Sequence, residues 1–192
     1  MSYLRKIEYE IVLRESFSVI RGCSGCGEKT HFKNTKKFRV NANGNKLDVW
    51  LIYQCEKCKH TFKLAIYERQ KVSSIPKEEY ERFLSNDEQL AEIYGKSMQL
   101  FRKNKVDVDF ERLDYDFIKR HEIIKDSDLE EQTALVIYNS YGLKIRPEKQ
   151  IAEVLGLSRS QVQKMIQQGD IELENASMQF ISVYLKQLLF TG

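Results

Sequence analysis

Two pairs of cysteines constrain the fold of this chain more than any other feature. Cys23 and Cys26 form one Cys-x-x-Cys pair, and Cys55 and Cys58 form the other. Each pair can supply two thiolates from one tight turn, and a zinc ion takes four such ligands at the corners of a tetrahedron. The chain contains no other cysteine. We therefore predict a single structural Zn²⁺ site that organises the first third of the chain.

The sequence between the two pairs predicts a β-hairpin. The 28 intervening residues exceed the usual spacing of about 15 to 20. Residues 38–54 hold two β-prone stretches around Asn43-Gly44, a dipeptide that suits a hairpin turn. Because a hairpin runs out along one strand and returns along the other, it brings both cysteine turns together. Residues 61–67 alternate as a third strand would, and the β-prone segment from Tyr3 to Ile20 is expected to lead into this domain.

Other chemistries could use the same four cysteines. A Cys-x-x-Cys pair beside a helix N-terminus can exchange disulfides, but both pairs here lie among predicted strands and turns. An iron site of the rubredoxin type takes the same ligands. A catalytic zinc is disfavoured, because four thiolates leave no position for water. His31 and His60 could replace a cysteine, although we expect both outside the ligand set.

Charge is distributed unevenly along the chain. Residues 1–72 hold 15 basic and 7 acidic side chains, residues 73–132 hold 10 and 16, and residues 133–192 hold 6 and 5. A basic first part favours contact with a polyanion. No apolar run approaches the roughly 18 residues of a membrane-spanning helix, so we expect a cytoplasmic protein with no membrane partner. In that reducing compartment, paired cysteines favour metal binding over disulfides.

The acidic middle of the chain has helical signals. Pro76 suits the start of a helix and follows a change in composition, which places a domain boundary here. Ser85 and Glu88 have the spacing of a capping box, so we predict a helix over residues 86–103. Residues 109–121 could form a second helix, whereas residues 133–141 are typical of a strand.

Residues 147–169 predict two short helices joined by a tight corner. Pro147 suits a first helical position, and Gly156 suits a left-handed helix end. Ser158 and Gln161 form a capping box for the second helix. The outer face of that helix carries groups that can contact phosphates or base edges, namely Arg159, Gln163, Lys164 and Gln167. A plain helical hairpin with solvated polar residues stays an alternative.

The segment that runs from Ile145 and Arg146 to Gly169-Asp170-Ile171 resembles the S4 RNA-binding domain. That domain occurs in a small-subunit ribosomal protein, in pseudouridine synthases and in tyrosyl-tRNA synthetase. The resemblance implies a helix pair followed by a short sheet. It also implies that Arg146, Arg159 and Lys164 contact RNA, and Lys149 matches the basic residue that follows the start of the S4 motif.

Nearly the whole chain is also similar to a bacterial family that is described only as a domain of unknown function. The similarity rests on the first Cys-x-x-Cys pair, on Phe38–Gly44 and on Leu47–Tyr53. It implies a bacterial cytoplasmic protein and carries no activity with it.

These patterns together predict an α+β protein in three parts. Residues 1–72 would form a zinc-ribbon β domain, residues 73–132 an acidic helical segment, and residues 133–192 an S4-like or helix-turn-helix-like unit. We expect a nucleic-acid-binding protein, with RNA ahead of DNA as the partner. A DNA-binding regulator that uses the same helix pair and a protein-interaction adaptor stay open. No catalytic triad order, phosphate loop or carboxylate pair indicates an enzyme, and the acidic stretch 107–116 is expected to be a solvated surface.

Overall fold

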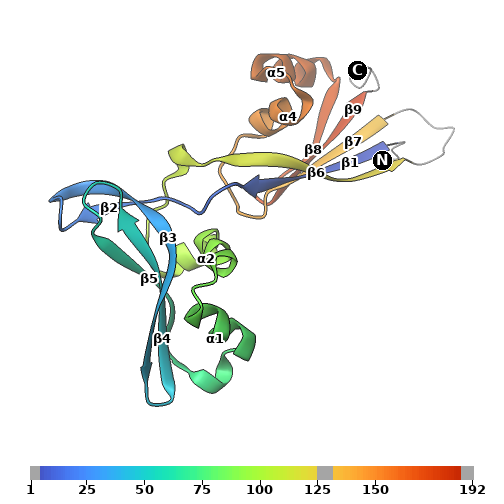
Figure 1. Cartoon of the computed structure of the whole chain (residues 1–192). Helices are drawn as coiled ribbons and strands as arrows, with labels where there is room; N and C mark the ends of the chain where they lie inside the picture. Colours follow the sequence, from blue (N-terminus) through green and yellow to red (C-terminus); the bar gives the residue numbers. More distant parts are fainter. Residues whose placement is uncertain (1–4, 125–131, 187–192) are drawn as a thin grey trace. The chain divides into compact units, whose positions relative to one another are not determined.

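The computed structural model describes residues 5–124 and 132–186. The chain divides into two compact units, one of Leu13–Asp114 and one of Met1–Val12 with Tyr115–Gly192. This division does not follow the expected boundaries near residues 72 and 132. Strands hold 47% and helices 27% of the described residues. Each unit has its own sheet, as Figure 1 shows.

The unit Leu13–Asp114 is built on a four-stranded antiparallel sheet in the order β2-β3-β4-β5. Its central hairpin confirms the predicted one, and the turn uses a positive φ of 61° at Gly44. Along β4, alternate side chains from Leu47 to Cys55 are buried, so only one face of the sheet is in the core. The strands are β2 (Val19–Cys23), β3 (Glu28–Asn43), β4 (Lys46–Cys55) and β5 (Thr61–Lys71).

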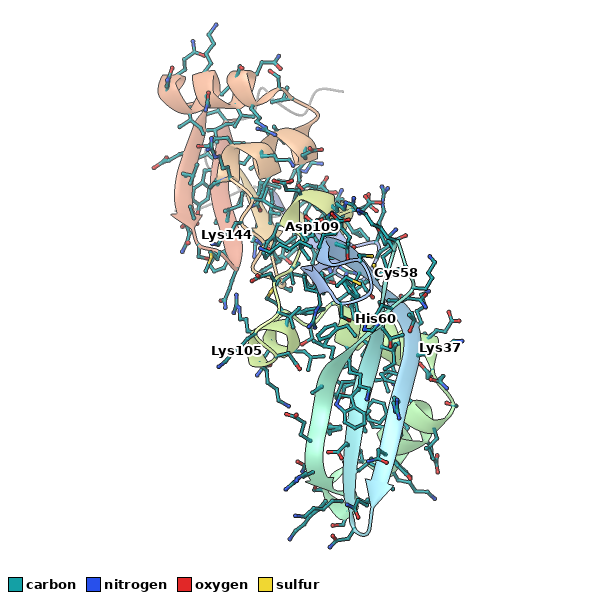
Figure 2. All side chains as sticks on the ribbon, turned by 90° about the vertical axis from the view of Figure 1, so that its left-hand side faces the viewer. Lys37, Cys58, His60, Lys105, Asp109 and Lys144 are labelled. Atoms are coloured by element: carbon teal, nitrogen blue, oxygen red, sulfur yellow. The ribbon has the colours of Figure 1, made fainter. Side chains whose placement is uncertain are left out.

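Three short helices cover the buried face of this sheet (Figure 1). Phe38 of β3 packs edge-on against Phe83, with the ring centroids 4.9 Å apart. Tyr53 is fully buried, and its hydroxyl donates to the carbonyl of Phe17 at 3.1 Å. No helix of the described unit lies on the opposite face of the sheet, which is turned toward the reader in Figure 2. The helices are α1 (Lys77–Leu84), α2 (Glu88–Gly95) and α3 (Met98–Lys103), with 3₁₀ turns at Val72–Ser74 and Phe110–Arg112.

Several predictions for the middle of the chain are wrong in detail. The helix expected over residues 86–103 is two helices, because Ser97 starts a new one by accepting a hydrogen bond from the Leu100 amide. Ser85 does not cap α2. Instead Asp87 accepts from the Leu90 amide at 2.7 Å. Residues 109–121, expected as a helix, supply a 3₁₀ turn and most of a strand, β6 (Tyr115–Ile124).

The second unit contains a five-stranded sheet in the order β6-β1-β7-β9-β8. Strand β1 runs parallel to β7, and β9 pairs antiparallel with both β7 and β8. Consecutive residues of β7 and β9 are buried on both faces, so these strands form the centre of the unit. The remaining bounds are β1 (Arg5–Leu13), β7 (Gln132–Tyr138), β8 (Ile171–Ala176) and β9 (Phe180–Lys186).

Two helices form where the sequence predicts them, α4 (Pro147–Leu155) and α5 (Arg159–Gln168). Gly156 ends α4 with a φ of 66°, and both hydrogen bonds of the Ser158–Gln161 capping box are present. Ile151 and Val162 are fully buried, and they anchor the pair in the unit. No helix of the described ranges is long and apolar enough to span a membrane.

The predicted fold class is wrong. The described chain is mostly β, and its middle third is not a purely helical segment. The C-terminal part is not a separate S4-like or helix-turn-helix-like unit, because its sheet includes β1 from the other end of the chain. For the same reason β1 belongs to the five-stranded sheet and not to the unit that holds the four cysteines. Tyr3 lies outside the described residues. Such long-range pairing leaves no local signal, since parallel strands need a crossover connection rather than a turn.

Candidate metal centre

The four cysteines lie on two turns of the same kind. Cys23 and Cys26 occupy the turn between β2 and β3, where the amides of Cys26 and Gly27 donate to the Cys23 carbonyl at 3.2 and 2.8 Å. Cys55 and Cys58 occupy the turn between β4 and β5, where the Lys59 amide donates to the Cys55 carbonyl at 3.1 Å. In each turn, the fourth residue after the first cysteine has a positive φ, 72° at Gly27 and 65° at Lys59.

The sheet brings the two turns together at one end. The Cys23 and Cys58 sulfurs lie 3.4 Å apart, the Cys26 and Cys55 sulfurs 3.8 Å apart, and all four fall within 4.8 Å of one another. A tetrahedral ion with bonds of about 2.3 Å to sulfur would place its ligands roughly 3.8 Å apart. The four cysteines are free of disulfides. The cluster therefore has the dimensions of a four-thiolate metal site.

Hydrogen bonds around the sulfurs favour thiolates at two of the positions. Burial raises the pKa of Cys55, but bonds from the Thr30 hydroxyl and from the Cys58 and Lys57 amides outweigh it and lower the pKa to about 6. Burial also opposes ionisation of Cys23, and its pKa is nevertheless lowered by Cys58 and by nearby amides. A bond with Cys58, together with burial, raises the pKa of Cys26 to about 12. A cation bound at the cluster would displace the proton held by Cys26.

The two histidines near the cysteines have other partners. His60 forms a hydrogen bond with the Ser24 hydroxyl at 3.0 Å and so links the two turns from outside the cluster. Figure 2 shows His60 close to Cys58 at this end of the sheet. His31 Nδ1 lies 3.1 Å from the nearly buried carboxylate of Asp109. Neither histidine belongs to the group of converging ligand atoms.

Two residues that support the cluster escape sequence inspection. Thr30 Oγ1 lies 3.2 Å from the Cys55 sulfur, and this contact depends on the register of β3 against β4. Lys59 takes a backbone conformation that usually favours glycine. Only its place after the second Cys-x-x-Cys pair, equivalent to that of Gly27, could have indicated its role.

The side chains expected to contact nucleic acid lie far from the cysteines in sequence, on and beside α4 and α5. Lys149 is half-buried, and its ammonium lies 5.4 Å from the centre of the Tyr115 ring. Arg159 and Lys149 also line a small hollow of about 270 Å³ between the two helices. The other members are exposed, namely Arg146, Arg159, Gln163, Lys164 and Gln167.

A comparison with protein-family models gives one match, to a family described as a protein of unknown function (DUF1062), over residues 40–177. This match covers well over half of the chain. The chain belongs to the DUF1062 family. The expected similarity to a family of unknown function is thereby confirmed. No curated protein and no solved structure matches the chain.

The DUF1062 match contains part of the candidate metal centre. Cys55 and Cys58 lie inside the matched residues, together with α4 and α5, while Cys23 and Cys26 lie before them. The family description assigns no activity. The cysteine geometry and the exposed basic residues therefore carry the functional argument.

Proposed function

We propose that the four cysteines hold one structural Zn²⁺ ion, in a zinc ribbon that stabilises the unit Leu13–Asp114. The observation that carries this proposal is the convergence of the four sulfurs within 4.8 Å of one another. Cys23 and Cys55 are buried, which suits a site closed to water. A zinc ion would join the two cysteine turns, which otherwise are linked outside the cluster by Ser24 and His60.

Elemental analysis of gently purified protein tests the metal. We expect one zinc per chain, and the loss of zinc in a variant with Cys26→Ser and Cys55→Ser. Iron in place of zinc would overturn the choice of metal, and an absence of any metal would overturn the site. Reversible disulfide formation within a Cys-x-x-Cys pair under mild oxidation, without metal, would favour the redox alternative.

We further propose that the protein binds nucleic acid through the outer face of α5. The supporting observation is a set of exposed cations that lack acidic partners. In the part of the chain that the structure describes, Arg146, Arg159 and Lys164 take part in no ion pair. By contrast, Arg120 of β6 is paired with Glu10 at 2.6 Å. Arg159 and Lys164 lie on α5, a capped and well-anchored helix, and Arg146 precedes α4; unpaired cations of this kind are available to phosphates at little desolvation cost.

Titration of the full-length protein against an RNA hairpin, a single-stranded RNA and duplex DNA tests this function. We expect affinity to fall as salt rises, because each phosphate contact releases counterions. The logarithm of the binding constant falls linearly with the logarithm of the salt concentration. In the double variant Arg159→Gln/Lys164→Gln, the slope of that line should become shallower by about 0.7 to 0.9 for each phosphate contact removed. The nucleic acid that binds most tightly decides between RNA and DNA.

A matched control removes the same charge elsewhere. Lys77 of α1 and Arg102 of α3 are exposed on the helical side of the other unit. The double variant Lys77→Gln/Arg102→Gln should bind as the unmodified protein does. If both double variants lose the same affinity for nucleic acid, the loss is explained by net charge alone. That result would contradict a specific role for α5.

A further inference from the structure

The face of the β2–β5 sheet that carries no helix has an unusual composition. Cross-strand register places Arg39 of β3, Trp50 of β4 and Ala65 of β5 in one row on this face. The next row contains Ile52 and Lys63, and the row after it contains Lys33, Gln54 and Thr61. Because directly opposed residues of antiparallel strands point to the same side, these side chains share one surface. We call the side chains of these three rows, together with Lys37, the open face.

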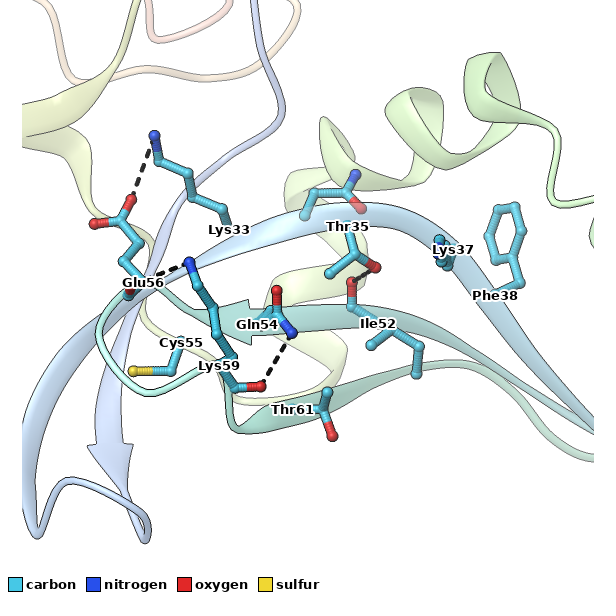
Figure 3. A pocket seen from close by; sticks show the side chains of 11 residues that line it. Lys33, Thr35, Lys37, Phe38, Ile52, Gln54, Cys55, Glu56, Lys59 and Thr61 are labelled. Atoms are coloured by element: carbon cyan, nitrogen blue, oxygen red, sulfur yellow. Dashed lines mark hydrogen bonds and ion pairs between the residues drawn. The ribbon is translucent and has the colours of Figure 1, made fainter.

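A bulge in β3 adds Lys37 to the open face. The pairing of β3 with β4 shifts between Asn34 and Phe38. The Thr35 hydroxyl donates to the Ile52 carbonyl at 2.8 Å, and this bond holds the bulge against β4. Phe38 then points into the helical core, and Lys37 lies exposed at the rim of a groove of about 910 Å³ (Figure 3). The groove runs along the strands from the bulge toward Lys59.

Two cations beside the helices have acidic partners, whereas three on the open face have none among the described residues. On the helical side, Lys36 pairs with Glu92 at 2.7 Å, and Arg82 pairs with Asp87 at 3.2 Å. On the open face, Lys37, Arg39 and Lys63 form no ion pair with any residue that the structure describes. Lys33 is the exception, since it lies 3.3 Å from Glu56 at the end of the groove. The open face therefore presents positive charge that the protein does not neutralise.

An aromatic ring lies among these cations. Trp50 is half-buried, and the ammonium of Lys63 lies 5.0 Å from the centre of its ring. Trp50 is the only tryptophan in the chain. The residue directly opposite Trp50 on β5 is the small Ala65, which leaves room beside the ring at that position. An aromatic surface between unpaired cations matches a nucleic-acid strand, whose bases stack on rings while its phosphates bind cations.

We infer that the open face binds single-stranded nucleic acid, with a base stacked on Trp50 and phosphates held by Lys37, Arg39 and Lys63. This inference rests on the proposed nucleic-acid function and adds a second surface and a class of ligand. Duplexes fit this surface less well, because their bases are stacked on one another and cannot reach the ring. The rows lie on rigid strands whose end is fixed by the cysteine turns, so zinc would also hold this surface in shape.

Tryptophan fluorescence tests the inference directly, because Trp50 is the sole source of the signal. Oligothymidylate and oligouridylate should quench the emission at low salt, and the quenching should fade as salt rises. Polyphosphate supplies charge without bases, and duplex DNA hides its bases, so both should bind with little quenching. Equal quenching by polyphosphate would overturn stacking on Trp50.

Variants separate the contribution of charge from that of the ring. Fluorescence anisotropy of a labelled oligothymidylate measures the affinity. For Arg39→Gln/Lys63→Gln, the slope of log affinity against log salt concentration should become shallower by about 1.4 if both side chains contact phosphates. Lys77→Gln/Arg102→Gln, which removes equal charge from the helical side, should change nothing. Trp50→Phe should keep most of the affinity, whereas Trp50→Leu should weaken binding about 5- to 150-fold. Thermal unfolding checks that both substitutions leave the fold intact.

Failure of this inference can be told from failure of the proposed function. If no nucleic acid binds the unmodified protein, both fall. If nucleic acid binds, the Trp50 emission stays constant, and only Arg159→Gln/Lys164→Gln weakens binding, then the function stands and the open face has no part in it. If Trp50→Phe and Trp50→Leu bind equally, the ring is not a stacking surface.

Discussion

The hydroxyl of Thr30 lies 3.2 Å from the sulfur of Cys55, and both groups are shielded from solvent. Phe32 of β3 pairs with Cys55 of β4, and Thr30 precedes Phe32 by two residues on the same strand. The pairing of β3 with β4 therefore creates this contact. A hydroxyl that donates to a thiolate stabilises its charge without occupying a ligand position. The candidate metal centre thus has a supporting contact from a residue outside the two cysteine turns.

Replacing Thr30 should weaken metal binding without removing a ligand. Thr30→Val keeps the shape and loses the hydroxyl, and we expect zinc affinity to fall about tenfold. Thr30→Ser keeps the hydroxyl and should stay close to the unmodified protein. Competition with a chromophoric chelator measures both affinities. Identical affinities for the valine and serine variants would show that the hydroxyl does not act on Cys55.

Removing the metal should destabilise the unit Leu13–Asp114. The two cysteine turns hold one end of its sheet, so a strong chelator should lower the thermal midpoint of this unit by several degrees. Calorimetry with and without chelator measures the shift. Added Zn²⁺ should restore the midpoint, whereas Mg²⁺, which prefers oxygen ligands, should not. An unchanged midpoint in protein shown to be metal-free would contradict a structural role.

Gly95 at the end of α2 has no room for a side chain. A Cβ atom there would lie 2.3 Å from the Ser16 hydroxyl and 2.6 Å from the Asn34 amide nitrogen. The Gly95 carbonyl also accepts from the Phe17 amide at 2.8 Å, which fixes the backbone in place. Gly95→Ala should therefore destabilise the protein by about 1 to 3 kcal/mol in denaturant unfolding.

Gly22 provides the control for that substitution. A Cβ at Gly22 meets no atom within 4 Å, and its φ is not in the left-handed region. Gly22→Ala should leave the unfolding midpoint nearly unchanged. If the two alanine variants have the same unfolding midpoint, the side chains around Gly95 move aside more easily than their short distances indicate.

The charge of Asp87 should make the stability of α2 depend on pH. Hydrogen bonds from Arg82 and from the Leu90 amide hold the pKa of Asp87 below its ordinary value of 3.8. A lowered pKa means that the stabilisation is present above that ordinary value and is lost as pH falls through the folded pKa. The gap in urea midpoint between the native protein and Asp87→Ala should therefore be largest near neutral pH and shrink in acid.

Asp87→Asn separates the cap from the charge. Asparagine can still accept from the Leu90 amide, so this variant should retain part of the stability at neutral pH. Its midpoint should change less with pH than that of the native protein. The same acid dependence in both proteins would assign the effect to other carboxylates.

Turns and helix ends of this protein could be predicted from sequence, because they depend on residues that are neighbours in the chain. The Gly44 turn, the Gly156 helix end and the Ser158–Gln161 capping box form as their residue types indicate. The prediction failed at residues 109–121, where charged and aromatic residues fit helix or strand equally. Pairing of β6 with β1 in the five-stranded sheet decided between the two. Ser85 failed as a cap because it ends α1, where its hydroxyl donates to the Arg82 carbonyl, and Asp87 caps α2 instead.

The sequence alone determined which atoms could form the metal centre, because four thiols in two turns of fixed spacing have few other arrangements. Only the tertiary structure decided that β1 joins the sheet of β7 and that three strands leave a cationic face around Trp50. The physical reason is range. A turn or a helix cap depends on the bond angles and hydrogen bonds of neighbouring residues, whereas strand partners are chosen by burial across the whole chain.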